Sequence, residues 1–348
     1  MTQSDSAKEE SDVGVEAIIH IFTMLNVDLD WSQTLKRGFE WWGSRLRQRI
    51  WVTPGYDDRG IIIYRVFIVC DCVRGIRKTQ NEVDSLLAPL AALSIGSAMV
   101  LDPNDNSLRC WTTATIHAGN SAWMTPLLCS LAIIQLIEAD SRAEVIAELA
   151  GGVIDTSSHP TSGERTVPDE MMTVMDVVFR PIGRRPSPWN GSSEIVQITE
   201  LLKQSNCFCL SDKTGISAEF PFGASTTLMR VITSENNPVI GSGVGIFLTL
   251  PIENSIKGAS MLSGALNRLE ANVKAPGHLI GSWCSRGDMT AFASFIPSAM
   301  HQTGVLLNLV ISASVRARWV GELLKPGVEP ADVIAMVAQR GQLLPSPE

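Results

Sequence analysis

Charged residues are scarce in this sequence, at 18% of its 348 residues against about 25% in an ordinary soluble chain. Basic residues are the scarcer sign, since 28 Lys and Arg against 36 Asp and Glu give a net charge of −8. A nucleic-acid-binding domain usually carries the opposite sign, so this balance argues against that class. Apolar residues make up 45% of the chain, which is enough for a large core and leaves apolar side chains for a binding surface.

The sequence also lacks an apolar run of the roughly 18 residues that a membrane-spanning helix needs. Its longest candidate, Leu127–Ile137, is interrupted by polar residues and predicts a buried helix instead. The amino-terminal residues are acidic at Glu9, Glu10 and Asp12, whereas a secretory signal begins with positive charge. We therefore expect a cytoplasmic protein without membrane insertion.

The seven cysteines are an odd number and are spread through apolar segments, whereas a secreted disulfide framework concentrates an even number in a small domain. Cys70 with Cys72, and Cys207 with Cys209, form two C-x-C pairs. On a strand both sulfurs of a pair point to one face, so two pairs can in principle supply four thiolates to zinc. The apolar context favours core packing, and we assign no metal-binding, cofactor-binding or catalytic residue.

The spacing of apolar residues predicts a first domain over residues 13–152. Apolar residues recur at steps of three and four from Trp31 to Ile50, which indicates a helix that begins at the cap Asp30. The expected elements are, in order, helix Val13–Asp28, helix Trp31–Ile50, strand Ile62–Cys72, helix Thr79–Leu93, a hairpin of Ala98–Leu101 with Leu108–Ile116, and the long helix Ser121–Ala150.

A second domain over residues 192–325 repeats this plan. It is expected to contain a short helix after residue 192, strands Phe208–Phe222, Thr226–Thr233 and Val244–Leu250, helix Ser260–Asn272, a hairpin of Leu279–Cys284 with Thr290–Pro297, and a final helix ending near Leu324. Residues 326–348 are expected to form a C-terminal helix after Pro330 and a tail. The sequence thus predicts an α+β fold of two similar halves, each an antiparallel sheet with helices at its start, middle and end.

Two segments differ in character from these domains. Residues 1–12 are polar and mostly acidic, which is typical of a disordered tail. Residues 153–191 are rich in Pro, Gly, Ser and charge, and we interpret them as the linker between the domains, with one short helix over Asp169–Val178. Because the linker also carries large apolar residues, it is expected either to pack against the body or to clamp a partner.

The repeated order of elements resembles the type III secretion chaperone-like fold, which is also seen in YbjN-like proteins. The resemblance is clearer over Ser193–Leu324 than over Trp31–Ala150, and it rests on element order because this fold has no diagnostic motif. It implies a twisted antiparallel sheet with helices and the binding of extended client segments, often by dimers. Two fused copies would resemble a built-in dimer, and the family implies no catalytic residues.

His117 and His301 stand at matching places, each at the end of a hairpin and before the last helix of its half. Acid–base catalysis needs an oriented partner and a reacting group nearby, and the sequence supplies neither. We therefore favour helix capping or packing for both histidines. The glycine-rich stretch 241–245 lacks the remaining residues of a phosphate-binding motif, so it predicts a turn that enters a strand.

The preferred function is a non-enzymatic, chaperone-like or adaptor-like module that holds a client polypeptide, with secretion or export as one setting. One alternative is an enzyme with a histidine and carboxylates between the halves. Another is a regulatory or nucleic-acid-binding protein that uses a basic first helix, in which Trp41 and Trp42 interleave with basic residues. These basic residues are Lys36, Arg37, Arg45, Arg47 and Arg49. Nucleic acid is disfavoured by the net charge of −8.

Overall fold

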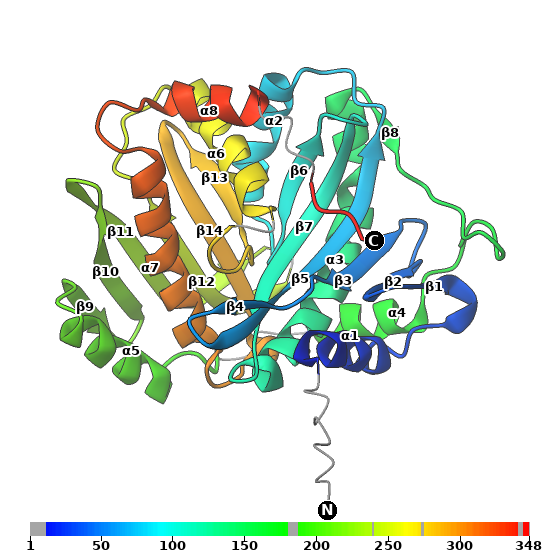
Figure 1. Ribbon diagram of the computed structural model, residues 1–348, viewed down its shortest axis with the longest axis horizontal. Coiled ribbons are helices and arrows are strands. Elements are labelled where there is room, and N and C mark those ends of the chain that lie inside the picture. Colours follow the sequence, from blue (N-terminus) through cyan, green and yellow to red (C-terminus); the bar gives the residue numbers. More distant parts are fainter. Residues whose placement is uncertain (1–11, 180–186, 239, 273–274, 340–343, 348) are drawn as a thin grey trace, which may run out of the picture.

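The computed structural model describes residues 12–179, 187–238, 240–272, 275–339 and 344–347 (Figure 1). The tail expected over residues 1–12 therefore lies outside the described residues, except for Asp12. The Asp12 side chain accepts a hydrogen bond from the Val15 N–H and caps helix α1 (Val13–Met24).

The first half forms an antiparallel sheet with helices at its start, middle and end. After α1 come the short 3-10 helix η1 (Leu29–Trp31) and strands β1 (Ser32–Leu35), β2 (Gly38–Trp41), β3 (Gln48–Val52), β4 (Tyr56–Asp58) and β5 (Ile61–Arg74). They are followed by α2 (Gln80–Ala91), the hairpin of β6 (Ala98–Asp102) and β7 (Ser107–Ile116), and α3 (Ser121–Ala150). The strand order is β1-β2-β3-β5-β7-β6, and β4 folds back on the start of β5.

The second half follows the same path. Its elements are α5 (Ser193–Gln204), β9 (Cys209–Asp212), β10 (Gly215–Phe222), β11 (Ser225–Asn237), β12 (Gly241–Thr249), α6 (Ile256–Glu270), β13 (Ser282–Arg286), β14 (Met289–Pro297), η2 (Ser298–Met300) and α7 (Val305–Leu323). The order β9-β10-β11-β12-β14-β13 matches that of the first sheet strand for strand. The predicted α+β fold of two similar halves is confirmed, and α8 (Pro330–Gln339) follows the second half.

The helix predicted over Trp31–Ile50 is wrong, because this stretch forms β1, β2 and β3. Short strands joined by tight turns place apolar residues at spacings of three and four, as a helix does. At Gly38 a Cβ atom would lie 2.6 Å from the Trp51 Cβ, so glycine allows the close approach of β2 and β3. The aromatic and β-branched residues of this stretch suit a half-buried sheet.

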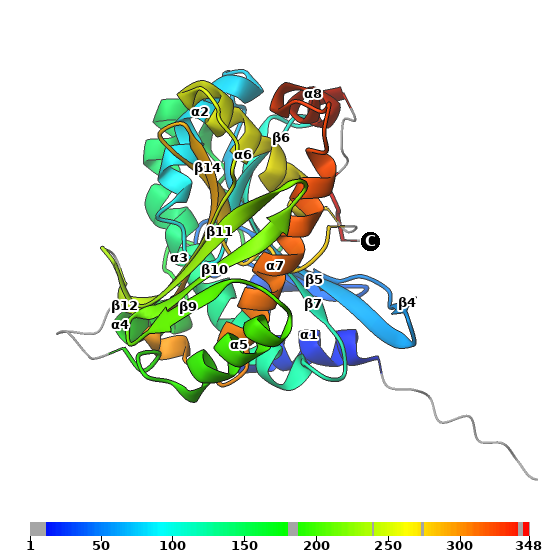
Figure 2. The same ribbon diagram turned by 90° about the vertical axis from the view of Figure 1, so that its left-hand side faces the viewer.

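The two halves pack in a reciprocal way. Figures 1 and 2 show α3 and α7 on opposite sides of the molecule, where α3 covers one face of the first sheet and α7 covers the opposite face of the second. Between them α2 contacts both α6 and β13, while α6 contacts β6. We call this contact of α2, β6, α6 and β13 the seam. Each half thus offers equivalent elements to the other, as in a twofold dimer.

A close helix crossing holds the seam together. Gly264 of α6 lies against Asp84 of α2, and a Cβ at Gly264 would lie 2.2 Å from the Asp84 carboxylate. Arg268, one turn further along α6, forms a two-pronged ion pair with Asp84 at 2.9 Å, and both side chains are buried. Because glycine has no side chain, Gly264 leaves room for the Asp84 carboxylate, which forms the ion pair with Arg268.

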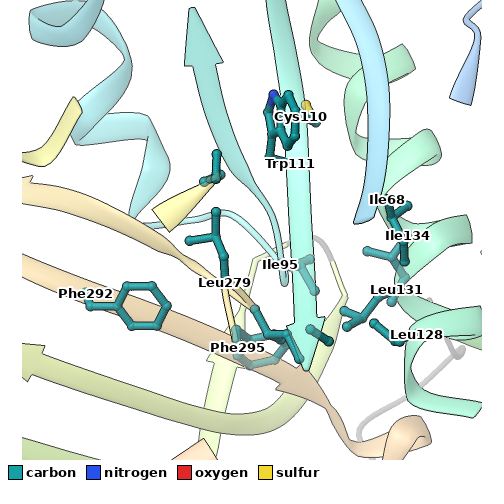
Figure 3. Close-up of a cluster of buried hydrophobic side chains, with 14 of the residues drawn as sticks. Ile68, Ile95, Cys110, Trp111, Leu128, Leu131, Ile134, Leu279, Phe292 and Phe295 are labelled. Carbon is teal, nitrogen blue, oxygen red and sulfur yellow. The ribbon is translucent and has the colours of Figure 1, made fainter. Parts of the chain in front are cut away.

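One apolar core runs through both halves (Figure 3). On the first half it includes Trp111 of β7 and Leu131 of α3, and on the second half it includes Leu279, Phe292 and Phe295. The segment before β13 pairs with β7, since the Thr113 N–H donates to the Leu279 carbonyl at 3.1 Å. The halves are thus joined by backbone pairing as well as by side-chain packing.

Arg65 of β5 adds a buried polar link between the halves. Its Nη1 donates to the carbonyl oxygens of Ala275 and Gly277, and its Nη2 donates to the Thr113 hydroxyl and to the Glu270 carbonyl oxygen. Burial lowers the Arg65 pKa to about 10, which leaves the guanidinium charged at neutral pH. A charge held by four acceptors, three of them from the second half, fixes the relative position of the halves.

The segment expected to be the linker, residues 153–191, packs in large part on the first half. It contains β8 (Val153–Ile154), which pairs with the end of β5, and α4 (Glu170–Phe179), which contacts α3. Between them the His159 ring packs edge-on against Trp42 at 4.8 Å. Residues 180–186 lie outside the described residues.

Candidate functional site

The two singled-out histidines make local contacts. The Nδ1 of His117 accepts a hydrogen bond from the Gly119 N–H at 3.1 Å, and the His117 N–H donates to Asn120 Oδ1 at 2.9 Å. His301 is exposed, and its ring lies 4.6 Å from the Trp189 ring. Both histidines thus contact residues close to the start of the last helix of their half or to the segment before α5, and these contacts are compatible with a packing role.

A different histidine, His278, is buried between the halves. Its Nδ1 accepts a hydrogen bond from the Thr115 N–H at 3.0 Å, and its Nε2 contacts the Asn308 side-chain oxygen. Burial lowers the His278 pKa to about 3, so the ring is neutral at physiological pH. Neither hydrogen bond involves a carboxylate, and these contacts give the enzyme alternative no oriented acid–base pair.

The cysteine pairs lie in different halves. Cys70 and Cys72 are buried on β5, and Cys110 stands opposite Cys70 on β7. A hydrogen bond with Cys72, together with burial, raises the Cys110 pKa, and this favours the neutral thiol over the metal-binding thiolate. Cys207 and Cys209 lie at the start of the second sheet. Within the described residues, no group of three or more His, Cys, Asp or Glu side chains is placed to hold a metal ion.

The basic residues of the expected first helix lie on strands and loops, where several pair with carboxylates. Arg37 pairs with Asp12, and Arg45 pairs with Asp140 and Glu144. Arg47 and Arg49 both pair with the buried Asp71, as does Arg109 of β7. Burial alone would raise the Asp71 pKa, but the charges of Arg49, Arg47 and Arg109 hold it below its usual value. This pairing leaves little positive charge for a nucleic-acid backbone.

The glycine-rich stretch 241–245 is the first part of strand β12 rather than a turn before it. A Cβ at Gly243 would lie 2.4 Å from Phe295, and one at Gly245 would lie 2.8 Å from Phe247. These glycines therefore make room for neighbouring aromatic rings.

The outer strand of the second sheet, β9, has an open edge. It pairs with β10 on one side, and no strand in the described part of the chain pairs with its other side (Figure 2). Phe208 and Leu210 are 59% and 61% exposed, and they point to the same face because they are two residues apart. An unpaired edge with exposed apolar side chains is a template for adding another strand.

A further exposed apolar residue lies on the same face of the sheet. Leu228 of β11 is 44% exposed and faces Glu219 of β10, which in turn pairs with Phe208. A hollow of about 250 Å³ lies beside Leu210 and is also lined by Ser217 and Arg230. The opposite face is covered by helices, since β10 contacts α7 and both β9 and β10 contact α5. We call the surface of Phe208, Leu210 and Leu228 the edge patch.

A second surface lies at the first half, between η1 and the start of α4. It is a groove of about 860 Å³ with Leu29, which is 74% exposed, and Val174 among its apolar residues. The Arg165 guanidinium lies in this groove. Its Cζ is 5.1 Å from the centroid of the Trp31 ring, and its Nη2 is 3.2 Å from Asp169 Oδ2. The neighbouring edge of β1 is partly covered, because the Ser32 carbonyl contacts the His159 ring. A partner in this groove could therefore contact side chains, but the edge of β1 is less open to an added strand than the edge of β9.

Comparison of the chain with protein-family models, curated proteins and solved structures finds no match.

The two most apolar helix segments are mainly buried, as expected for Leu127–Ile137. Leu127–Ile137 lies within α3 and contributes to the core, and most apolar residues of Leu306–Val320 are buried on α7. Of the helices in the described chain, α3 alone has the length and composition to cross a membrane, and 72% of its most apolar stretch is buried in the protein.

Sequence reasoning missed β9 because it treated Phe208–Phe222 as one strand. The signal was present in the turn residues Asp212 and Gly215. Asp212 Oδ1 accepts hydrogen bonds from the Thr214 and Gly215 N–H groups, which is a typical turn for a short polar residue followed by glycine. Division at this turn would have placed Leu210 on a short strand of its own.

Proposed function

We propose that this protein is a non-enzymatic, chaperone-like or adaptor-like module that binds an extended segment of a client polypeptide along β9. The supporting observation is the unpaired edge of β9 with exposed Phe208 and Leu210 beside it. A client strand would form backbone hydrogen bonds with this edge and place alternate side chains on the edge patch. The resemblance of the element order to secretion chaperones agrees with this function. We also place the protein in the cytoplasm, where its seven free cysteines would stay reduced.

The size of the edge patch suits weak and reversible binding. Full burial of a Leu or Phe side chain is worth about 1.5–3 kcal/mol. Ordering a flexible client segment costs about 2–5 kcal/mol. Because the edge patch has only three partly exposed apolar residues beside a strand of four residues, we expect weak binding, which suits a protein that must release what it holds.

The experiment compares Leu210→Lys with Leu29→Lys, since both residues are exposed leucines in different halves. The proteins are mixed, without ATP, with a reduced model protein whose aggregation is followed by light scattering. We expect the wild-type chain and Leu29→Lys to suppress aggregation equally, and Leu210→Lys to lose most of the effect. A lysine at the edge disfavours strand addition through its charge and hydration.

Circular dichroism and thermal unfolding would show that both variants keep the wild-type fold, since substitutions at exposed positions usually change stability little. Loss of suppression by Leu29→Lys alone would move the binding site to the groove of the first half. A wild-type chain that suppresses no aggregation and captures no extended peptide would refute the proposed function.

A further inference from the structure

The carboxyl-terminal segment Leu344–Pro347 crosses the face of the first sheet that α3 leaves uncovered (Figure 1). It forms neither helix nor strand, and Leu344 packs against the apolar core. Its last three residues line a cavity of about 420 Å³ together with Trp51 and Tyr56. The segment Leu344–Pro347 thus lies in a groove built by the first half, although it comes after α8 in the sequence.

Trp51 lines the floor of this groove, and two buried aromatic rings hold it in place. Trp51 stacks on Phe67, with ring centroids 5.0 Å apart and planes 15° from parallel, and Trp111 meets both rings edge-on at 6.2 Å. Tyr56, at the start of β4, is 49% exposed and contributes an outer wall. Lys36 and Arg37 line the same cavity from the turn between β1 and β2. The surroundings are therefore a rigid aromatic base with polar side chains at the rim.

The sequence of the tail matches this groove. Pro345 and Pro347 have fixed backbone angles, and each restricts the residue before it to an extended conformation. Leu344 and Ser346 are thus restricted to extended backbone, and φ is fixed at Pro345 and Pro347, so docking costs less conformational entropy than for an ordinary segment. Aromatic-lined grooves are a recurring way to bind such segments.

The tail does not fill the groove. The remaining 420 Å³ exceeds the roughly 30 Å³ of one water molecule more than tenfold. The tail contributes only two prolines and a serine to the cavity wall. A segment with a larger apolar side chain beside its prolines would therefore make more contacts than the chain's own end does.

We infer that this groove is a binding site for an extended, proline-containing segment of a partner polypeptide, and that Leu344–Pro347 occupies it as an internal competitor. The site lies on the first half, apart from β9, and so adds to the proposed function. A tethered segment acts at an effective concentration on the order of millimolar. A partner must displace the tail, and weak partners are thereby rejected.

The test uses a dye-labelled peptide with the sequence of residues 343–348, Leu-Leu-Pro-Ser-Pro-Glu, and follows its fluorescence anisotropy. Its titration compares the full-length wild-type chain with the full-length double variant Pro345→Gly, Pro347→Gly. We expect the double variant to bind the peptide at least about fivefold more tightly, because its own tail competes less well. A control peptide with both prolines replaced by glycine should bind neither protein measurably.

Two further substitutions in the double-variant background locate the site. Tyr56→Ala should weaken peptide binding several-fold, whereas Leu93→Ala, which removes a side chain of similar exposure after α2 and outside both proposed surfaces, should leave it unchanged. Equal affinity of the wild-type and double-variant chains would refute the competition by the tail. No binding to the double variant at millimolar peptide, or binding insensitive to Tyr56→Ala, would refute the site itself. Neither result bears on suppression of aggregation through Leu210, so the two proposals fail separately.

Discussion

Among single residues, Glu138 shows how burial sets the protonation of this core. It lies on α3, where its carboxylate accepts a hydrogen bond from the Ile95 N–H at 3.1 Å and contacts Arg142 at 3.0 Å. Burial raises the Glu138 pKa to about 7, because Arg142 and the N–H group of Ile95 only partly offset the loss of water. The folded chain therefore favours a neutral carboxyl group over much of the range in which an exposed glutamate is charged.

This pKa predicts a defined dependence of stability on pH. The carboxyl group of the unfolded chain titrates near 4.5, so the unfolded state releases its proton first and the free energy of unfolding falls as pH rises from 4.5 to about 7. Glu138→Gln keeps an oxygen for the Ile95 N–H and removes the charge. We expect it to stabilise the protein at pH 8 by up to about 3 kcal/mol relative to its effect at pH 4.5. Urea unfolding at both pH values measures this difference.

Glu144→Gln, on the exposed side of the same helix, is the matched control and should show no comparable difference between pH 4.5 and pH 8. If Glu138→Gln is instead more destabilising at pH 8 than at pH 4.5, the ion pair with Arg142 outweighs burial.

At the scale of elements, the crossing of α2 and α6 depends on one missing side chain. A methyl group at Gly264 would meet the Asp84 carboxylate, which cannot move aside without breaking its ion pair with Arg268. We expect Gly264→Ala to lower the free energy of unfolding by about 1–3 kcal/mol, as overpacking of a core does. Gly258→Ala in the same helix meets its nearest neighbour, Ser255 Oγ, at 3.2 Å and should change stability by less than about 1 kcal/mol. Denaturant unfolding measures the free energy of unfolding of both variants. Equal losses for Gly264→Ala and Gly258→Ala would contradict the proposed role of Gly264 in the helix crossing.

The elements also show what the sequence could and could not predict. The helices α2, α3, α6 and α7 were predictable because each has a long segment with apolar residues at helical spacing or in a continuous run, together with clear end signals, as at Gly151, which ends α3 in the left-handed conformation. The stretch Trp31–Ile50 was not predictable from spacing, because strand pairing with β5 decides its structure. Likewise the edge patch depends on which strand is outermost, and strand order is a property of the assembled sheet.

At the scale of the whole molecule, the Arg65 network makes the two halves one unit of stability. Arg65→Met would leave buried acceptors on both halves without a donor, among them the Glu270 and Gly277 carbonyl oxygens. We expect a loss of about 3–5 kcal/mol, as when a buried charge network loses one partner. Arg74→Met, at the exposed end of the same strand, should cost far less.

Hydrogen exchange in increasing denaturant measures whether the halves unfold together. We expect the amides of β5 and β12 to lose protection at the same denaturant concentration, and Arg65→Met to shift both by the same amount. Separate transitions for the two strands would show independent domains, and light proteolysis within residues 153–191 would then release two stable fragments.

The reciprocal seam has a consequence for how such a chain can diversify. In a homodimer both subunits change together, so every substitution at the interface or on the surface occurs twice. Here the ion pair across the seam occurs once, with Asp84 from the first half and Arg268 from the second. Because the halves belong to one chain, they stay together at any dilution. Each half is thus free to diverge while its neighbour stays constant. In the first half, Leu344–Pro347 crosses the open sheet face, whereas the second half keeps an uncovered outer strand, and the seam sets the spacing between these two unlike surfaces.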